Sequence, residues 1–76
     1  MHYVYVLKLV NKTYYVGQTA DLRKRLENHR SGNTPHTRKF RPVDLEFYCA
    51  FRSKTKALDF EKYLKTGSGK AFKKKR

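Results

Sequence analysis

The stretch YYVGQTADLRKRLENHR, residues Tyr14 to Arg30, decides the architecture of the chain. It begins with the residues of a β-strand, turns at a glycine and continues as a helix rich in positive charge. Thr19 is predicted to cap this helix, with Asp21 in its first turn, where the helix dipole favours negative charge. Gly32 is well placed to end it.

The predicted helix aligns polar side chains with its leucines. At 100° per residue, four side chains fall within an arc of about 100°, namely Leu22, Arg25, Leu26 and His29. The leucines mark the side of the helix that faces a sheet. Arg25 and His29 are therefore predicted to lie along that seam or at its end.

The segments around this stretch add strands and a second helix. Residues 3–9 and 14–17 are predicted strands that form a β-hairpin, and residues 43–51 form a third strand. A second helix begins at Ser53 or Thr55 and runs to about residue 65. The order β-β-α-β-α predicts an α+β fold, a small three-stranded antiparallel sheet flanked by helices.

A chain of 76 residues has room for one domain, which we assign to residues 1–72. A short helical turn is expected near its end, before a basic tail at residues 73–76. In the third strand, Val43, Leu45 and Phe47 alternate with polar residues and are predicted to share one side.

The side on which Tyr15 lies depends on the length of the hairpin loop. A two-residue loop, Asn11–Lys12, sends Tyr5 and Tyr15 to opposite faces of the sheet. A three-residue loop, Val10–Lys12, pairs Leu9 with Thr13 and places both tyrosines on the same face. The sequence leaves both registers open.

The net charge indicates a polyanionic partner. The chain has 19 Lys and Arg against 6 Asp and Glu, a formal net charge of +13, and nucleic acid is the usual partner of such an excess. A membrane surface is disfavoured because neither helix combines a broad apolar face with a basic one. One cysteine, no apolar run long enough to span a bilayer and no signal-peptide pattern predict a cytoplasmic protein.

The second helix carries a carboxylate in its apolar stripe. On a helical wheel Glu61 falls within the arc of Ala57, Phe60 and Leu64. A carboxylate there is costly unless it is paired or bound to a cation. Two interpretations remain open, a buried ion pair with Arg25 and a metal-binding carboxylate in a cleft.

These features together resemble the GIY-YIG nuclease family. YVY at residues 3–5 and YVG at residues 15–17 stand where the family has its GIY and YIG triplets. The run GQTADLRKRLENHRSG, residues 17–32, is similar to the family's pattern GxTxDLxxRxxxHxxG. FRPVDLEFY and KALDFEKYLKTGSGKAF extend the resemblance over nearly the whole chain.

The resemblance implies a metal-dependent phosphodiesterase that hydrolyses a nucleic-acid backbone. By position, Tyr5 and Tyr15 match the motif tyrosines, Arg25 the catalytic arginine and Glu61 the metal-binding glutamate. Glu61 would hold one Mg²⁺ or Mn²⁺ ion, and Arg25 would neutralise charge on the phosphate. Tyr5, Tyr15 and His29 all remain candidates for the general base, with Tyr15 favoured, and His29 could instead relay that proton or bind the phosphate.

The chain departs from the family pattern at two places. Tyr3 replaces the leading glycine of the GIY triplet, and the asparagine that larger members carry after the glutamate helix is missing. Ser68 or Lys70 could stand in for it. The missing asparagine is expected to affect catalytic efficiency more than the fold.

Basic residues elsewhere are predicted to bind nucleic acid without sequence selectivity, with His36 near the bound backbone. The predicted contacts are Arg23, His36, Arg38, Lys39, Arg41, Lys70, Lys73 and Lys74. We therefore expect a DNA endonuclease of the repair or recombination type, selective for structure, with a protein partner supplying any specificity. The alternative is a catalytically weak or inactive nucleic-acid-binding module of the same fold.

Overall fold

The structure is a computed structural model that describes residues 1–66. Six elements follow one another as β1 (His2–Lys8), β2 (Tyr14–Thr19), α1 (Leu22–Ser31), the 3₁₀ turn η1 (Arg38–Phe40), β3 (Asp44–Phe51) and α2 (Lys54–Leu64). This confirms the predicted β-β-α-β-α order. The predicted C-terminal turn, the boundary after residue 72 and the basic tail lie outside the described residues.

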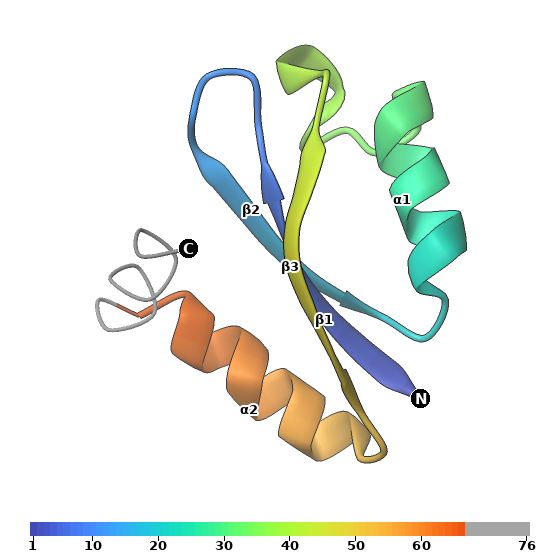
Figure 1. Cartoon of the computed structure of the whole chain (residues 1–76), viewed down its shortest axis with the longest axis vertical. Helices are drawn as coiled ribbons and strands as arrows, with labels where there is room; N and C mark the ends of the chain where they lie inside the picture. The colour runs from blue at the N-terminus through green and yellow to red at the C-terminus, as the bar shows by residue number, and fades with distance from the viewer. Residues whose placement is uncertain (67–76) are drawn as a thin grey trace.

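The three strands form one antiparallel sheet in the order β2-β1-β3, so the first strand lies at the centre. Helices α1 and α2 lie on opposite sides of this sheet (Figure 1). Because β1 contacts both layers, its side chains alternate between two cores. Val4 and Val6 point toward α2, whereas Tyr5 and Leu7 point toward α1.

The two cores differ in composition. The α2 side is apolar throughout, and its buried residues are Val4, Val6, Val16, Ala57 and Leu64. The α1 side has the buried residues Tyr5, Leu7, Leu9 and Val43, with Leu22 and Leu26 of the helix packed against them. The leucines of α1 therefore face the sheet, as the helical wheel predicts.

The hairpin adopts the three-residue loop. The Leu9 amide donates to the Thr13 carbonyl at 2.9 Å, and Lys12 has the positive φ of 68° that such a loop requires near its end. Strands β1 and β2 then pair odd with odd residues, Leu7 with Tyr15 and Tyr5 with Gly17. Both motif tyrosines therefore lie on the same face of the sheet.

A β-bulge in β3 corrects one expectation. Val6 pairs with Phe47, but Leu7 pairs with Leu45, so Glu46 is an extra residue between the two pairs. The extra residue reverses the alternation of side chains. Leu45 and Val43 therefore pack on the α1 side and Phe47 on the α2 side, whereas strict alternation predicts one common side.

Both helices begin with a side-chain cap. Asp21, not Thr19, caps α1, since its carboxylate accepts a hydrogen bond from the Lys24 amide at 3.0 Å. The Thr19 hydroxyl instead accepts from the Asp21 amide at 3.1 Å and supports the cap. Gly32 ends α1 in the left-handed conformation, with a φ of 86°, as predicted.

Helix α2 begins at the Ser53 cap, where the serine hydroxyl accepts from the Lys56 amide. It buries Ala57 and Leu64 against the sheet. Within residues 1–66, no helix has both the length and the apolar character needed to cross a bilayer.

Candidate active site

Tyr5 is the centre of the candidate site. Its side chain is fully buried, and its ring lies over Gly17, the residue that pairs with it on β2. A Cβ atom at Gly17 would lie 2.5 Å from the Tyr5 hydroxyl oxygen, closer than real side chains approach. The glycine of the YVG triplet is therefore needed because the phenol occupies the space where a side chain would be.

The Tyr5 hydroxyl continues into a buried hydrogen-bonded chain. It lies 3.0 Å from His29 Nε2, and His29 Nδ1 lies 2.7 Å from the Thr37 hydroxyl. His29 and Thr37 are both fully buried. A neutral imidazole donates through one nitrogen and accepts through the other, so the chain can carry a proton between Tyr5 and the loop.

Tyr15 forms the more accessible side of the site. It is half-buried, and its ring centroid lies 6.3 Å from that of Tyr5 and 5.1 Å from that of His29. The exposed side chain of His36 also lies nearby, with its ring centroid 6.2 Å from that of Tyr15. Solvent and a bound phosphate can thus reach Tyr15 more readily than Tyr5.

Arg25 and Glu61 both act on the Tyr5 hydroxyl. The pKa of Tyr5 is raised to about 12, first by burial and then by the neighbouring Tyr15, with a smaller contribution from the charge of Glu61, while the Arg25 guanidinium partly offsets the rise. Arg25 lies on α1 and Glu61 on α2. The candidate groups therefore come from β1, β2 and both helices.

His29 is held neutral at its buried position. Burial lowers the pKa of His29, and the positive charges of Arg25 and His36 lower it further. Enclosed in this way, the imidazole does not contact a phosphate arriving from solvent. Of the roles considered for His29, the structure is suited to positioning Tyr5 or relaying its proton.

Glu61 is not paired with Arg25. Its carboxylate is 17% exposed and forms an ion pair of 3.3 Å with Lys65, one turn further along α2. Within residues 1–66, no three His, Cys, Asp or Glu side chains gather into a metal-binding cluster. A single, largely buried carboxylate fits Mg²⁺ or Mn²⁺ only as an ion that keeps several waters and binds the substrate phosphate as well.

Two arginines of the connecting loop hydrogen-bond to the backbone at the C-terminal end of α1. Arg38 Nε donates to the Gly32 carbonyl at 3.0 Å, and Arg41 Nη1 donates to the Arg30 carbonyl at 3.4 Å. Cations are favourable at this end of a helix dipole. Both arginines remain exposed, so this structural role is compatible with the predicted phosphate contacts.

The other predicted contacts are spread over the surface. Arg23 and Lys39 are exposed, on α1 and η1 respectively. Lys70, Lys73 and Lys74, together with Ser68, lie outside the described residues.

Sequence reasoning missed Thr37 and the closeness of His36 to Tyr15. Thr37 lies in a loop eight residues after His29, where no periodic pattern connects the two positions. The TPHT segment, residues 34–37, carries turn-forming and polar residues but no signal that one of them is buried.

Comparison with known protein families identifies the class of protein. The family described as GIY-YIG catalytic domain matches residues 1–76, and the chain belongs to this family. GIY-YIG proteins are typically endonucleases, and the nucleases of this family bind nucleic acid and generally depend on a divalent metal ion.

Proteins with similar sequences or structures are found in several bacteria. A UPF0213 protein of Bacillus pumilus is 43% identical over 70 residues, which cover 91% of this chain and 71% of that protein. A UPF0213 protein of Streptococcus pyogenes serotype M3 is 45% identical over 64 residues, or 83% of this chain and 70% of that one. The solution structure of a UPF0213 protein from Bacillus halodurans has a TM-score of 0.59 at 34% identity and covers 92% of this chain and 78% of its own.

Proposed function

We propose that this protein is a metal-dependent endonuclease that hydrolyses phosphodiester bonds in DNA. The observation that carries the proposal is the convergence of Tyr5, Tyr15 and His29 with two groups of opposite charge that act on the Tyr5 phenol. A nuclease needs a cationic group for the phosphate, a carboxylate for a metal ion and a group that accepts the proton of water. A role in DNA repair or recombination and a cytoplasmic location are part of the same proposal.

Glu61 would hold the single Mg²⁺ or Mn²⁺ ion. Such an ion, when bound, supplies Lewis-acid polarisation of the phosphate and stabilises the leaving oxygen. Arg25 supplies fixed guanidinium donors to the non-bridging phosphate oxygens. Because the charge of Arg25 also acts on the Tyr5 hydroxyl, the phosphate would lie beside the phenols.

Tyr15 is assigned the general-base role. It is half-buried, whereas Tyr5 is fully enclosed with a pKa of about 12. Tyr5 is then a positioning residue. It stands at one end of the hydrogen-bonded series Tyr5–His29–Thr37 and would hold Arg25 in place. Accepting a proton from water at neutral pH requires a phenol beside positive charge, which the bound ion would supply.

A second candidate is a nucleic-acid-binding module without appreciable catalysis. The ion pair of Glu61 with Lys65 favours this alternative, because a carboxylate already paired with a cation is less available to a metal ion. The net charge of +13 suits both candidates equally.

Cleavage of labelled duplex, single-stranded and branched DNA, with Mg²⁺, Mn²⁺ or EDTA, tests the proposal. We expect metal-dependent nicking that falls by about 10²-fold or more in Glu61→Gln, Arg25→Ala and Tyr15→Phe. Asp59→Asn is the matched control, because Asp59 is an exposed carboxylate on the same helix, and it should cleave as the unmodified protein does.

Binding separates the two candidates. Glu61→Gln removes a negative charge and should bind DNA as tightly as the unmodified protein, or more tightly. Salt-sensitive binding with no cleavage under either metal would overturn the nuclease assignment in favour of the binding module. Equal loss of cleavage in Asp59→Asn and Glu61→Gln would remove Glu61 from the metal site.

A further inference from the structure

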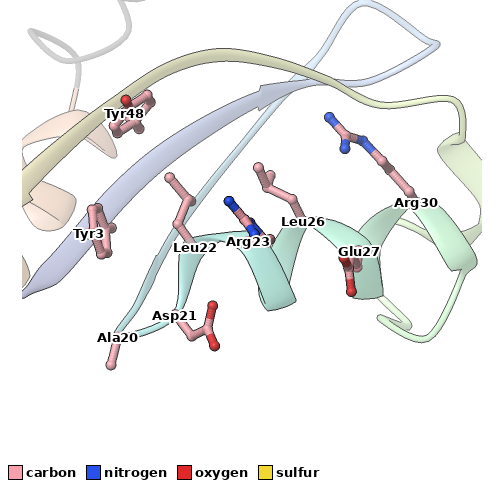
Figure 2. Close-up of a pocket in the computed structure, with 9 residues that line it drawn as sticks. All are labelled: Tyr3, Ala20, Asp21, Leu22, Arg23, Leu26, Glu27, Arg30 and Tyr48. Carbon is pink, nitrogen blue, oxygen red and sulfur yellow. The ribbon is translucent and has the colours of Figure 1, made fainter.

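A groove of about 540 Å³ lies between α1 and the strands, on the flank of the helix away from Arg25. Tyr3 and Tyr48 line its strand side, with ring centroids 6.4 Å apart. Figure 2 shows Leu22, Leu26 and Arg30 pointing from α1 toward these strands. The carboxylates that also border the groove, those of Asp21 and Glu27, point away from the strands (Figure 2).

The groove lies next to the candidate active site, on the same face of the sheet. Tyr48 of β3 pairs directly with Tyr5 of β1, and Tyr5 pairs on its other side with Gly17 of β2. Paired residues point to the same face, with Cβ atoms about 5 Å apart. Tyr3 lies two residues before Tyr5 on that face, a rise of about 7 Å. The groove therefore begins one side chain away from Tyr5.

Tyr48 presents an exposed ring on which an aromatic ligand could stack. Its side chain is 54% exposed although it lies in the middle of a strand. Exposed aromatic rings beside arginines are how proteins bind unpaired bases, since every base can stack on a ring while the guanidinium meets the phosphate. The net charge of +13 favours a polyanion over an uncharged aromatic compound or a peptide.

We propose that this groove binds an unpaired base of a nucleic-acid strand, stacked on Tyr48 and Tyr3 with its phosphate toward Arg30. The inference rests on the proposed function, because it places a single-stranded segment next to the phosphate that Arg25 and Glu61 would hold. The substrate class is then a strand with unpaired nucleotides at the cleavage position, such as a flap, a gap or a single strand.

Binding without metal tests this inference independently of cleavage. Labelled single-stranded DNA, single-stranded RNA and duplex DNA of equal length are titrated by fluorescence anisotropy in EDTA. We expect Tyr48→Ala to bind both single strands about tenfold more weakly and duplex almost unchanged, because one stacking contact is lost. Tyr48→Phe keeps the ring and should retain the affinity.

Tyr63→Ala is the matched control, because Tyr63 is a 44% exposed tyrosine on α2, away from the groove. It should change single-strand binding less than twofold, and thermal unfolding verifies that each variant is folded. Equal effects of Tyr48→Ala and Tyr63→Ala, or equal losses on duplex and single strands, would overturn the groove assignment. Loss of single-strand binding in Tyr48→Ala would support the groove even if no metal gave cleavage.

Discussion

The two sides of the sheet bury different chemistry. The α2 side is an apolar core closed by Ala57 and Leu64, whereas the α1 side encloses a phenol, an imidazole and a hydroxyl joined by hydrogen bonds. Within residues 1–66, no buried polar side-chain atom lacks a hydrogen-bond partner. The α2 side thus supplies most of the apolar packing, whereas the α1 side holds hydrogen-bonded polar groups at fixed positions, to which Glu61 of α2 is the one candidate group added from the other helix.

The largest effect is expected on the apolar side. Leu64→Ala should lower the free energy of unfolding by about 3 kcal/mol, because Leu64 is fully buried and its truncation leaves a cavity. That loss is a large share of the roughly 4–11 kcal/mol expected for a chain of this length. Urea denaturation gives the value. Val10→Ala, at a 54% exposed position in the hairpin loop, should change it by less than about 0.5 kcal/mol.

A smaller loss of stability, with a larger loss of function, is expected from Gly17→Ala. The added methyl group would lie 2.5 Å from the Tyr5 hydroxyl oxygen and 2.7 Å from Cζ of its ring, so the buried phenol must move. We expect a cost of about 2 kcal/mol in unfolding free energy and a fall in cleavage of about 10²-fold as Tyr5 leaves His29 and Arg25.

A double-mutant cycle with Tyr5→Leu tests the origin of that loss. If Gly17→Ala acts through the phenol, the losses of unfolding free energy caused by Gly17→Ala and Tyr5→Leu should be strongly non-additive in the double variant, as measured by urea denaturation. Additive losses of unfolding free energy would show that Gly17 does not act through Tyr5. The α1 side would then be no more sensitive to the position of its polar groups than the α2 side is to its packing.

The smallest expected effect is a pH dependence confined to the α1 side. The pKa of His29 is lowered in the folded protein from its ordinary value of 6.5, so the unfolded chain binds more protons below about pH 6.5. The free energy of unfolding should therefore decrease as the pH falls from 6.5 through the folded-state pKa. Urea denaturation between pH 7.5 and pH 5 should show this slope of unfolding free energy against pH. The slope should be reduced in His29→Gln.

His36→Gln is the control for that measurement, since His36 is an exposed histidine of the neighbouring loop. The slope should largely persist in this variant. A slope that disappears equally in both variants would mean that the charge of His36, rather than the burial of His29, governs the titration.

Local sequence signals were sufficient for the order of elements. Gly32 marked the end of α1, and Ser53 was one of two predicted caps of α2, whereas Thr19 was the wrong cap for α1. The leucine stripe of α1 predicted His29 beside the sheet, where it meets Tyr5, because helical periodicity needs no knowledge of distant contacts. The side on which Tyr15 lies was not predictable, because it depends on one residue of loop length. The bulge at Glu46 and the partner of His29 depend on contacts between distant segments, which no local pattern encodes.

The position of β1 in the centre of the sheet has a consequence for synthesis on the ribosome. Its partner β2 follows within a few residues, but its other edge stays open until the chain extends from Lys8 to Phe51. At bacterial and eukaryotic elongation rates this takes roughly 2–9 s. During that interval the nascent hairpin exposes an unpaired strand rich in Val and Tyr, the kind of edge that promotes aggregation. The first strand to be made is thus among the last to be fully protected.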